Sequence, residues 1–184
     1  TLIATGGISY PATGSDGSGY RLARQAGHTI MPPQPSLCSL VSPDPACRRM
    51  MGLALRNVTL TLLCDGKPLF TEQGEALFTH FGLSGPLVLS ASAHMDFARD
   101  RYAAHIDLKP ALEEEKLEAR ILRDIAQAPN KAFHNFLEGL LPRRMVPVMG
   151  ARVDIAPDLP VNALTKAQRR RLVEAMKHFA LPLA

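Results

Sequence analysis

Two glycine-rich segments near the start of the chain have residue types and spacing suited to ligand chemistry. Residues 1–7 read TLIATGG, which predicts a hydrophobic strand ending in small residues that let the backbone approach a nucleotide closely. Residues 13–19 read TGSDGSG, and the backbone amides of such a loop at a helix N-terminus bind anions. The segment lacks the lysine and the spacing of a P-loop, so a loop that caps the following helix explains it equally well.

The densest mid-chain cluster of polar side chains and small residues spans residues 79–86, which read THFGLSGP. His80 and Ser84 have the types of a base and a nucleophile, but no acid at a suggestive position completes a triad. The segment also lacks the strand-to-helix context of a nucleophile elbow. We therefore favour a tight turn in which these side chains bond backbone groups, and the catalytic residues stay unassigned.

The other titratable residues form no pattern of metal ligands. The three cysteines have no C-x-x-C spacing, which predicts reduced thiols in a cytosolic protein rather than a zinc site or a disulfide framework. The histidines stand apart from one another and from acidic residues at ligand spacing, so we predict no metal site. Arg169-Arg170-Arg171 are expected on a solvated helix face. The cysteines and histidines concerned are Cys38, Cys47, Cys64, His28, His105, His134 and His178.

Composition places the chain among ordinary folded domains. It has 184 residues, 46% of them hydrophobic, with a net charge of +4. No apolar run approaches the ~18–20 residues that span a bilayer, so we expect no membrane partner. The basic residues are spread along the chain, which argues against a nucleic-acid partner.

Glycine and proline divide the chain into three predicted parts. Residues 1–35 hold one short helix, roughly Tyr20 to Ala26, and end in an extended connector rich in proline. Residues 36–109 alternate with a period of two, which predicts a small barrel or sandwich. The strands are expected near 58–62, 69–70, 75–79, 86–90 and 102–108, with a hairpin turn at 65–66.

The third part, residues 110–184, has helical periodicity. Acidic residues 113–115 suit the first turn of a helix, and Thr165-x-x-Gln168 predicts a capping box for the last one. Strands followed by helices, without regular alternation, favour an α+β fold with two subdomains. The expected helices cover about 113–125, 133–141, 143–149 and 165–179, the last burying Leu172, Val173, Met176 and Phe179.

Taken in order, the motifs resemble a bacterial flavoprotein family. They are residues 4–7, 9–15, 27–28, 35–37, 79–86 and 106–110. Together they are similar to the BaiN/YhiN-type flavoproteins, also described as aminoacetone-oxidase-family FAD-binding enzymes. The resemblance covers nearly the whole chain, and the octapeptide 79–86 is its most specific signal.

The resemblance implies that the chain is an internal fragment. In that family a Rossmann-like FAD-binding domain is interrupted by an insert made of a β-barrel and a helical subdomain. Residues 1–35 would then be an edge of the FAD domain, 36–109 the barrel and 110–184 the helical part. No Gly-x-Gly-x-x-Gly occurs in the chain, as expected if the start of the FAD domain lies elsewhere.

The resemblance also implies a cofactor, FAD, and residues beside it. The implied activity of the full-length protein is that of a cytoplasmic FAD-dependent oxidoreductase with a small-molecule substrate, in which this chain contributes one wall of the flavin site and the substrate-side insert. Ser18 stands where the family pattern has Asp. Tyr10 and His80 are the candidate proton donors. The alternative is a non-catalytic interaction module that holds no cofactor by itself. The implied cofactor-binding residues are Ala4, Thr5, Gly6, Gly7, Gly14 and Gly17.

Overall fold

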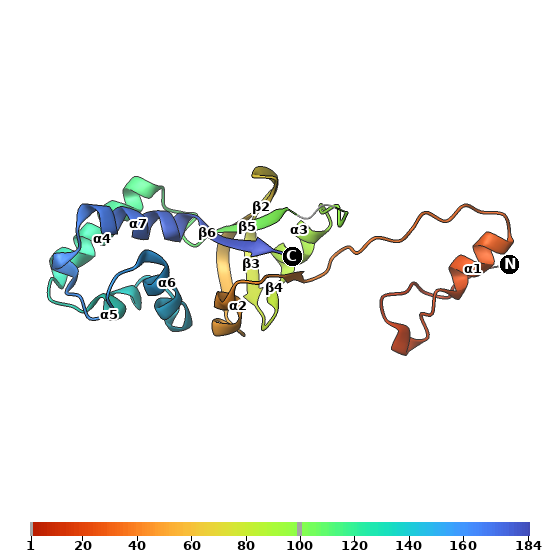
Figure 1. The fold of residues 1–184 in the computed structure, drawn as a ribbon, viewed down its shortest axis with the longest axis horizontal. Helices are drawn as coiled ribbons and strands as arrows, with labels where there is room; N and C mark the ends of the chain where they lie inside the picture. Colours follow the sequence, from red (N-terminus) through yellow and green to blue (C-terminus); the bar gives the residue numbers. More distant parts are fainter. Residues whose placement is uncertain (1, 99–100) are drawn as a thin grey trace. The chain divides into compact units, whose positions relative to one another are not determined.

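The computed structural model describes residues 2–98 and 101–184, and the chain divides into two compact units, Thr1–Gln34 and Pro35–Ala184 (Figure 1). The first unit holds the 3-10 helix η1 (Pro11–Thr13) and the helix α1 (Ser18–Gln25). None of its described residues is buried. The helix predicted over 20–26 is confirmed as α1, which begins two residues earlier than predicted.

The strand expected at residues 1–7 is not formed. Residues 2–7 have no regular secondary structure, and residue 1 lies outside the described residues. A strand is stable only when its backbone groups pair with a neighbour, and the first unit supplies no such strand among its described residues. The prediction of a strand was wrong for this chain because periodicity alone says nothing about a partner.

The second unit is built on one antiparallel sheet of six strands in the order β1-β4-β3-β2-β5-β6. The outer strands β6 and β1 meet where the Ala184 amide donates to the Val41 carbonyl at 3.0 Å. The Ser42 hydroxyl adds a bond to the Pro182 carbonyl at 2.7 Å. These contacts bring the sheet almost to a closed barrel. The strands are β1 (Leu40–Val41), β2 (Ala54–Cys64), β3 (Lys67–Phe78), β4 (Gly82–Ser84), β5 (Tyr102–Asp107) and β6 (Phe179–Leu183).

Two irregularities in the β2–β3 ladder help the long hairpin to curve. The register shifts between Leu55 and Val58, where Asn57 has a φ of 55°, and again between Leu62 and Leu63. Extra residues of this kind bend a strand and increase its twist, as barrel closure requires. The inward face of the sheet is fully buried at Leu60, Leu62, Phe78, Ala104 and Ile106.

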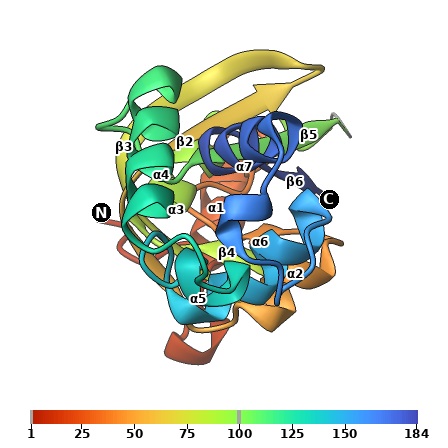
Figure 2. The same ribbon diagram turned by 90° about the vertical axis from the view of Figure 1, so that its left-hand side faces the viewer.

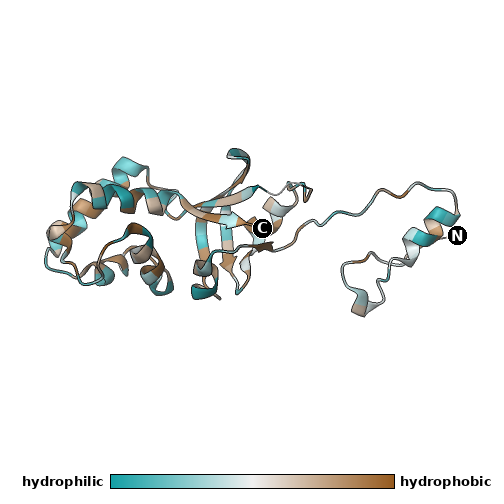
Figure 3. Cartoon of the chain, in the orientation of Figure 1, coloured by the Kyte–Doolittle hydropathy of each residue, from teal (hydrophilic) through white to brown (hydrophobic). Residues whose placement is uncertain are grey.

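Helices pack beside the barrel and extend from it (Figure 2). The helix α4 packs against α7, and α5 and α6 lie below them in this view. Hydrophobic and hydrophilic residues alternate around α4 and α7 (Figure 3), as expected for helices with one buried face. The helical elements are α2 (Pro45–Arg49), α3 (Pro86–Ser92), α4 (Glu114–Gln127), α5 (Phe133–Leu137), η2 (Arg143–Met145), α6 (Val146–Val153), η3 (Val161–Ala163) and α7 (Lys166–Lys177).

The α+β class, the barrel and the capping box at Thr165 are confirmed, and the elements differ in detail. The predicted segments 69–70 and 75–79 belong to one strand, β3. Helix α5 is shorter than predicted, ending at Leu137, while the helix expected over 143–149 is a 3-10 turn followed by α6.

Residues 86–90, predicted as a buried strand, form helix α3 instead. Pro86 fits the first turn of a helix because its missing amide needs no partner there. A short apolar run without polar breaks has no period that separates a strand from a buried helix. Gly74 in β3 makes room for the helix, since a Cβ atom there would lie 3.1 Å from the Leu87 side chain.

Phe179, expected on the last helix, instead begins strand β6. It is fully buried, as predicted, but α7 ends before His178, whose φ of −130° is no longer helical. The chain then pairs with β5, with Ala180 opposite His105. Hydrophobic spacing predicted the burial correctly, while the change from helix to strand depends on a pairing distant in sequence.

Candidate functional site

The structure brings the two glycine-rich segments of the first unit together. A Cβ atom on Gly19 would overlap the Thr5 hydroxyl, and one on Gly6 would lie 2.8 Å from the Ser15 hydroxyl. Residues 4–7 therefore lie directly against the loop 13–19. The small residue at Gly6 is explained by this internal packing.

The loop 13–19 ends in an ordinary helix start. Asp16 accepts a hydrogen bond from the Ser18 amide at 2.9 Å, and Gly17 stands at the N-cap with a φ of 77°. The backbone amide of Ser18 is the main cause that lowers the pKa of the exposed Asp16 carboxyl. A carboxylate therefore lies at the helix start where a phosphate would bind, which favours the capping interpretation over a phosphate cradle.

Gly7 is a candidate residue whose small size is not explained by any contact with the residues that the structure describes. Its φ lies outside the left-handed region, and no atom lies within 4 Å of the position that a Cβ would take. Gly14 is equally open, but its φ of 88° already favours glycine. An open backbone next to small residues fits one edge of a bulky planar cofactor bound from outside this unit.

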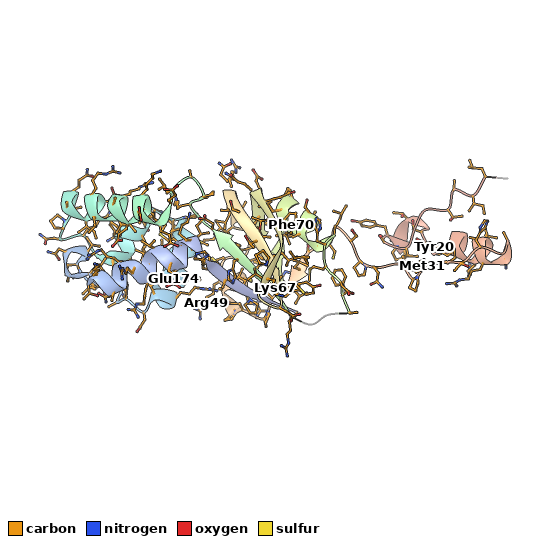
Figure 4. The ribbon with its side chains drawn as sticks, turned by 90° about the horizontal axis from the view of Figure 1, so that it is seen from above. Tyr20, Met31, Arg49, Lys67, Phe70 and Glu174 are labelled. Carbon is orange, nitrogen blue, oxygen red and sulfur yellow. The ribbon has the colours of Figure 1, made fainter. Side chains whose placement is uncertain are left out.

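The first unit also exposes large apolar side chains. Leu2 is 90% exposed, Met31 78% and Tyr10 74%; Figure 4 labels Met31 and Tyr20 in this unit. Isolated exposed hydrophobics are common, but a unit with no buried residue among those described has no core of its own. Its surface is suited to being covered by other protein.

In the octapeptide 79–86, residues 79–81 form the turn between β3 and β4, Gly82–Ser84 are β4, and Pro86 begins helix α3. The strand-to-helix context that the sequence was expected to lack is therefore present. The Thr79 amide donates to the Gly82 carbonyl at 2.8 Å, and the Gly82 amide donates to the Thr79 hydroxyl at 3.1 Å. The Ser39 hydroxyl donates a hydrogen bond to the Ser84 hydroxyl at 2.8 Å. The partner of Ser84 is therefore Ser39, and His80 does not act as its base. His80 is exposed, with its ring 4.9 Å from that of Phe81 in an edge-on contact.

Sequence reasoning missed the close approach at Gly82. A Cβ atom on Gly82 would overlap the Leu40 carbonyl and lie 2.7 Å from the Ser42 amide. The turn therefore lies directly against β1, and this contact limits the movement of the exposed His80 and Phe81. The residues Gly-Leu-Ser-Gly-Pro at 82–86 signal a tight turn, but not which strand the turn contacts.

Two ion pairs between partly buried side chains connect the helices to the barrel region, and neither was predicted. Lys177 contacts the Asp107 carboxylate at 2.6 Å and donates to the Leu112 carbonyl at 2.6 Å. Arg152 contacts Asp44 at 2.6 Å and lies 3.9 Å over the Phe179 ring. These groups are structural, since each charge is already matched within the fold.

An apolar pocket of about 680 Å³ lies between α5 and α6. Phe133, Leu137, Val146 and Ile155 contribute to its lining. His134 is the imidazole in the lining, and its Nδ1 lies 2.9 Å from the Pro157 carbonyl. The pocket offers an apolar surface rather than a reactive group.

Two other kinds of site, a metal centre and a membrane span, find no support among the described residues. Among residues 2–98 and 101–184, no three His, Cys, Asp or Glu side chains gather so as to hold a metal ion. No helix in the same ranges is long and apolar enough to span a membrane. Arg170 and Arg171 are exposed as predicted, whereas Arg169 is partly buried and donates to the Leu164 carbonyl at 2.8 Å.

Comparison with known proteins shows which sequences this chain resembles. The chain is 28% identical over 185 residues to a 3-dehydro-bile acid delta(4,6)-reductase of Clostridium scindens, covering 99% of this chain and 45% of that protein. It is 31% identical over 180 residues to a ribosomal RNA dihydrouridine synthase of Haemophilus influenzae, covering 97% and 42%. The corresponding protein of Escherichia coli is 29% identical over 178 residues, covering 95% and 42%.

The chain thus spans less than half the length of the curated relatives it matches. Residues 34–184 match the family described as HI0933-like protein barrel and H2TH domain. This range contains every strand of the barrel and the helices beside it. The chain therefore belongs to the HI0933-like family and carries its barrel and H2TH domain.

Proposed function

We propose that the chain is the middle segment of an FAD-dependent reductase that adds two hydrogens across a carbon–carbon double bond. The observation that carries the proposal is the alignment with the bile-acid reductase, which covers 99% of the chain and so includes the first unit as well as the barrel. The names of both kinds of relative, a delta(4,6)-reductase and a dihydrouridine synthase, describe saturation of a double bond. The substrate itself does not transfer with the fold.

In this proposal, residues 4–7 and the loop 13–19 form one wall of the flavin site. Gly7 leaves its backbone open toward the cofactor, and the packing of Gly6 on Ser15 fixes the shape of that wall. These residues would hold FAD, which, reduced by an external two-electron donor, would supply the hydride equivalent that one carbon of the double bond needs. The other carbon takes a proton from the protein or from water.

The proton donors that the chain offers are His80 and Tyr10. Both side chains are exposed, and His80 stands on a turn held rigid by the Thr79–Gly82 bonds and by β1. A proton donor needs a fixed position and an exposed side chain, and the exposed His80 in its hydrogen-bonded turn has both. We expect replacement of His80 by Gln to slow turnover while flavin content stays unchanged.

A second candidate is a non-catalytic interaction module, favoured by the exposed apolar surface of the first unit. Both proposals predict that the isolated chain binds FAD weakly or not at all, because one wall cannot enclose a dinucleotide. Micromolar binding of FAD to the isolated chain, measured by calorimetry, would contradict this prediction.

The test of the proposed flavin wall is a substitution of Gly7 in the full-length protein. A Val side chain at Gly7 fills open space within the first unit, so it should leave folding unchanged and reduce bound flavin severalfold. Gly150→Ala, in helix α6 of the second unit, is the matched control and should keep the flavin. Equal flavin content in both variants would show that Gly7 does not form part of the cofactor wall.

A further inference from the structure

The apolar pocket between α5 and α6 (Figure 2) contains none of the residues assigned to the flavin wall. Its volume of about 680 Å³ falls within the range of about 300–1,000 Å³ that is typical of sites for small molecules. Phe133, Leu137, Val146 and Ile155 contribute to its lining, and all four are buried. The pocket therefore has the size and the apolar wall of a ligand site that the proposed reductase chemistry does not use.

Backbone hydrogen bonds fix the segment after α6 against the start of α5. The Phe133 amide donates to the Leu159 carbonyl at 2.9 Å, and the His134 amide donates to the Pro157 carbonyl at 2.9 Å. The amide of Asp154, which ends α6 with a φ of 51°, donates back to the helix. A pocket with fixed walls binds a ligand at a low cost of ordering the protein.

Gly150 on α6 keeps part of the wall open. It belongs to the lining, and no atom lies within 4 Å of the position that its Cβ would take. Its φ lies outside the left-handed region, so the backbone does not require glycine. Glycine weakens a helix interior relative to alanine. The visible effect of this glycine is to leave space in the pocket.

The charges in the lining are mostly negative. Glu138 and Asp154 are acidic, and Arg143 is the cation among the lining residues. Arg143 lies 3.6 Å from Glu138, while Asp154 is exposed and makes no ion pair with any residue that the structure describes. A chain with a net charge of +4 thus has an uncompensated carboxylate at its apolar pocket. This charge favours a cation over an anion.

His134 adds an acceptor rather than a second charge. Its amide and its Nδ1 both lie 2.9 Å from the Pro157 carbonyl. Because a carbonyl only accepts, Nδ1 carries the proton, and Nε2 of the neutral ring is an acceptor. An ammonium group donates three hydrogen bonds and accepts none, so it matches a lining whose polar groups are mostly acceptors.

We propose that this pocket binds a small hydrophobic ammonium compound. Its apolar body lies between α5 and α6, and its cationic nitrogen lies at the carboxylates of Asp154 and Glu138. A compact pocket of this volume suits a small molecule, whereas the helix of a protein partner needs a long groove. The inference goes beyond the proposed reductase, since the site needs no flavin.

The test titrates three probes with the same ring system into the full-length protein by isothermal calorimetry. They are naphthylmethylammonium, naphthalenemethanol and naphthoate, which differ in charge and share the apolar body. The ammonium should bind at least about tenfold more tightly than the carboxylate, with the alcohol between them, because only the ammonium is attracted by the free carboxylate.

Two variants separate the contribution of charge from that of space. Asp154→Asn removes the charge and keeps the fold, because Asn adopts the left-handed region as Asp does. It should weaken the ammonium about threefold, as expected for one partly exposed charge pair, and leave the alcohol unchanged. Gly150→Leu fills the open space and should weaken all three probes at least about tenfold.

The matched control is Glu174→Gln, which removes one exposed carboxylate that does not line the pocket; Glu174 is labelled in Figure 4. It should stay within about 1.5-fold of the wild type for every probe. Circular dichroism shows whether each variant is folded. If Gly150→Leu does not fold, the comparison of Asp154→Asn with the control decides the test.

Several results would overturn the proposal. They are no binding of the ammonium to the wild type, binding of naphthoate as tight as that of the ammonium, and equal weakening by Asp154→Asn and Glu174→Gln. Unchanged affinity in a folded Gly150→Leu variant would place the probe elsewhere. A peptide of Leu and Lys that binds this pocket more tightly than the ammonium probe would assign the site to a protein partner instead.

Discussion

Replacing Gly82 by Ala tests the most constrained point of the barrel. The added Cβ would overlap the Leu40 carbonyl and lie 2.7 Å from the Ser42 amide, both backbone atoms of the β1 region. Backbone cannot move aside as a flexible side chain can, so β1 must separate from β4. Strand β1 has only two residues, and its pairing with β4 is correspondingly short.

The cost can be worked out from the bonds at risk. They are the bond from the Ser42 amide to the Phe81 carbonyl at 2.9 Å, the bond from the Ser39 hydroxyl to the Ser84 hydroxyl at 2.8 Å, and the backbone pairing of Leu40 with Leu83 and of Val41 with Gly82. Loss of two or three such bonds costs about 2–3 kcal/mol. Gly82 has a φ of 156°, and the strain of a non-glycine residue at that angle adds about 1 kcal/mol. We expect a total loss of about 3–4 kcal/mol in the free energy of unfolding.

Urea unfolding followed by circular dichroism measures this loss. Gly150→Ala is the matched control, because nothing lies within 4 Å of its Cβ position and it stands in helix α6. There alanine should be neutral or stabilise by up to about 1 kcal/mol. A Gly82→Ala variant within about 0.5 kcal/mol of the wild type would refute the steric argument.

Two further predictions concern titratable groups. Burial, and secondarily His178, lower the pKa of His105, so the folded state holds this proton less tightly than the unfolded state. Stability should therefore fall as the pH drops through the ordinary histidine range near 6.5, and His105→Gln should reduce that fall in urea titrations at several pH values; an unchanged pH dependence would contradict it. Burial raises the pKa of the Cys47 thiol, which is 1% exposed. A thiol reagent should label the partly exposed Cys38 and Cys64 first, and Cys47 only after unfolding; early labelling of Cys47 would show that this region opens.

The sequence predicted what depends on local pattern. The β2 strand with its alternating Val58 and Leu60, and the capping box at Thr165, were read from spacing within a few residues. What it could not predict depends on distant partners. Helix α3 replaced a strand because Gly74 opened space for it, and β6 formed because β5 offered a free edge.

The candidate site shows the same division. Packing of residues 4–7 on the loop 13–19 was not predicted from the residues, and their role toward a cofactor stays a prediction. In residues 79–86 the tight turn was predicted correctly only for 79–81, since Gly82–Ser84 form strand β4 and Ser84 bonds the Ser39 side chain rather than a backbone group. The closure of this turn against β1 through Gly82 required the folded backbone.

The central claim is that the chain is part of a flavin-dependent reductase. The most direct test is an absorbance spectrum of the full-length protein, purified without added cofactor. We expect the bands of oxidised flavin at about 370 and 450 nm, bleached on reduction. A colourless protein that also fails to take up FAD would contradict the claim and leave the interaction module as the better description.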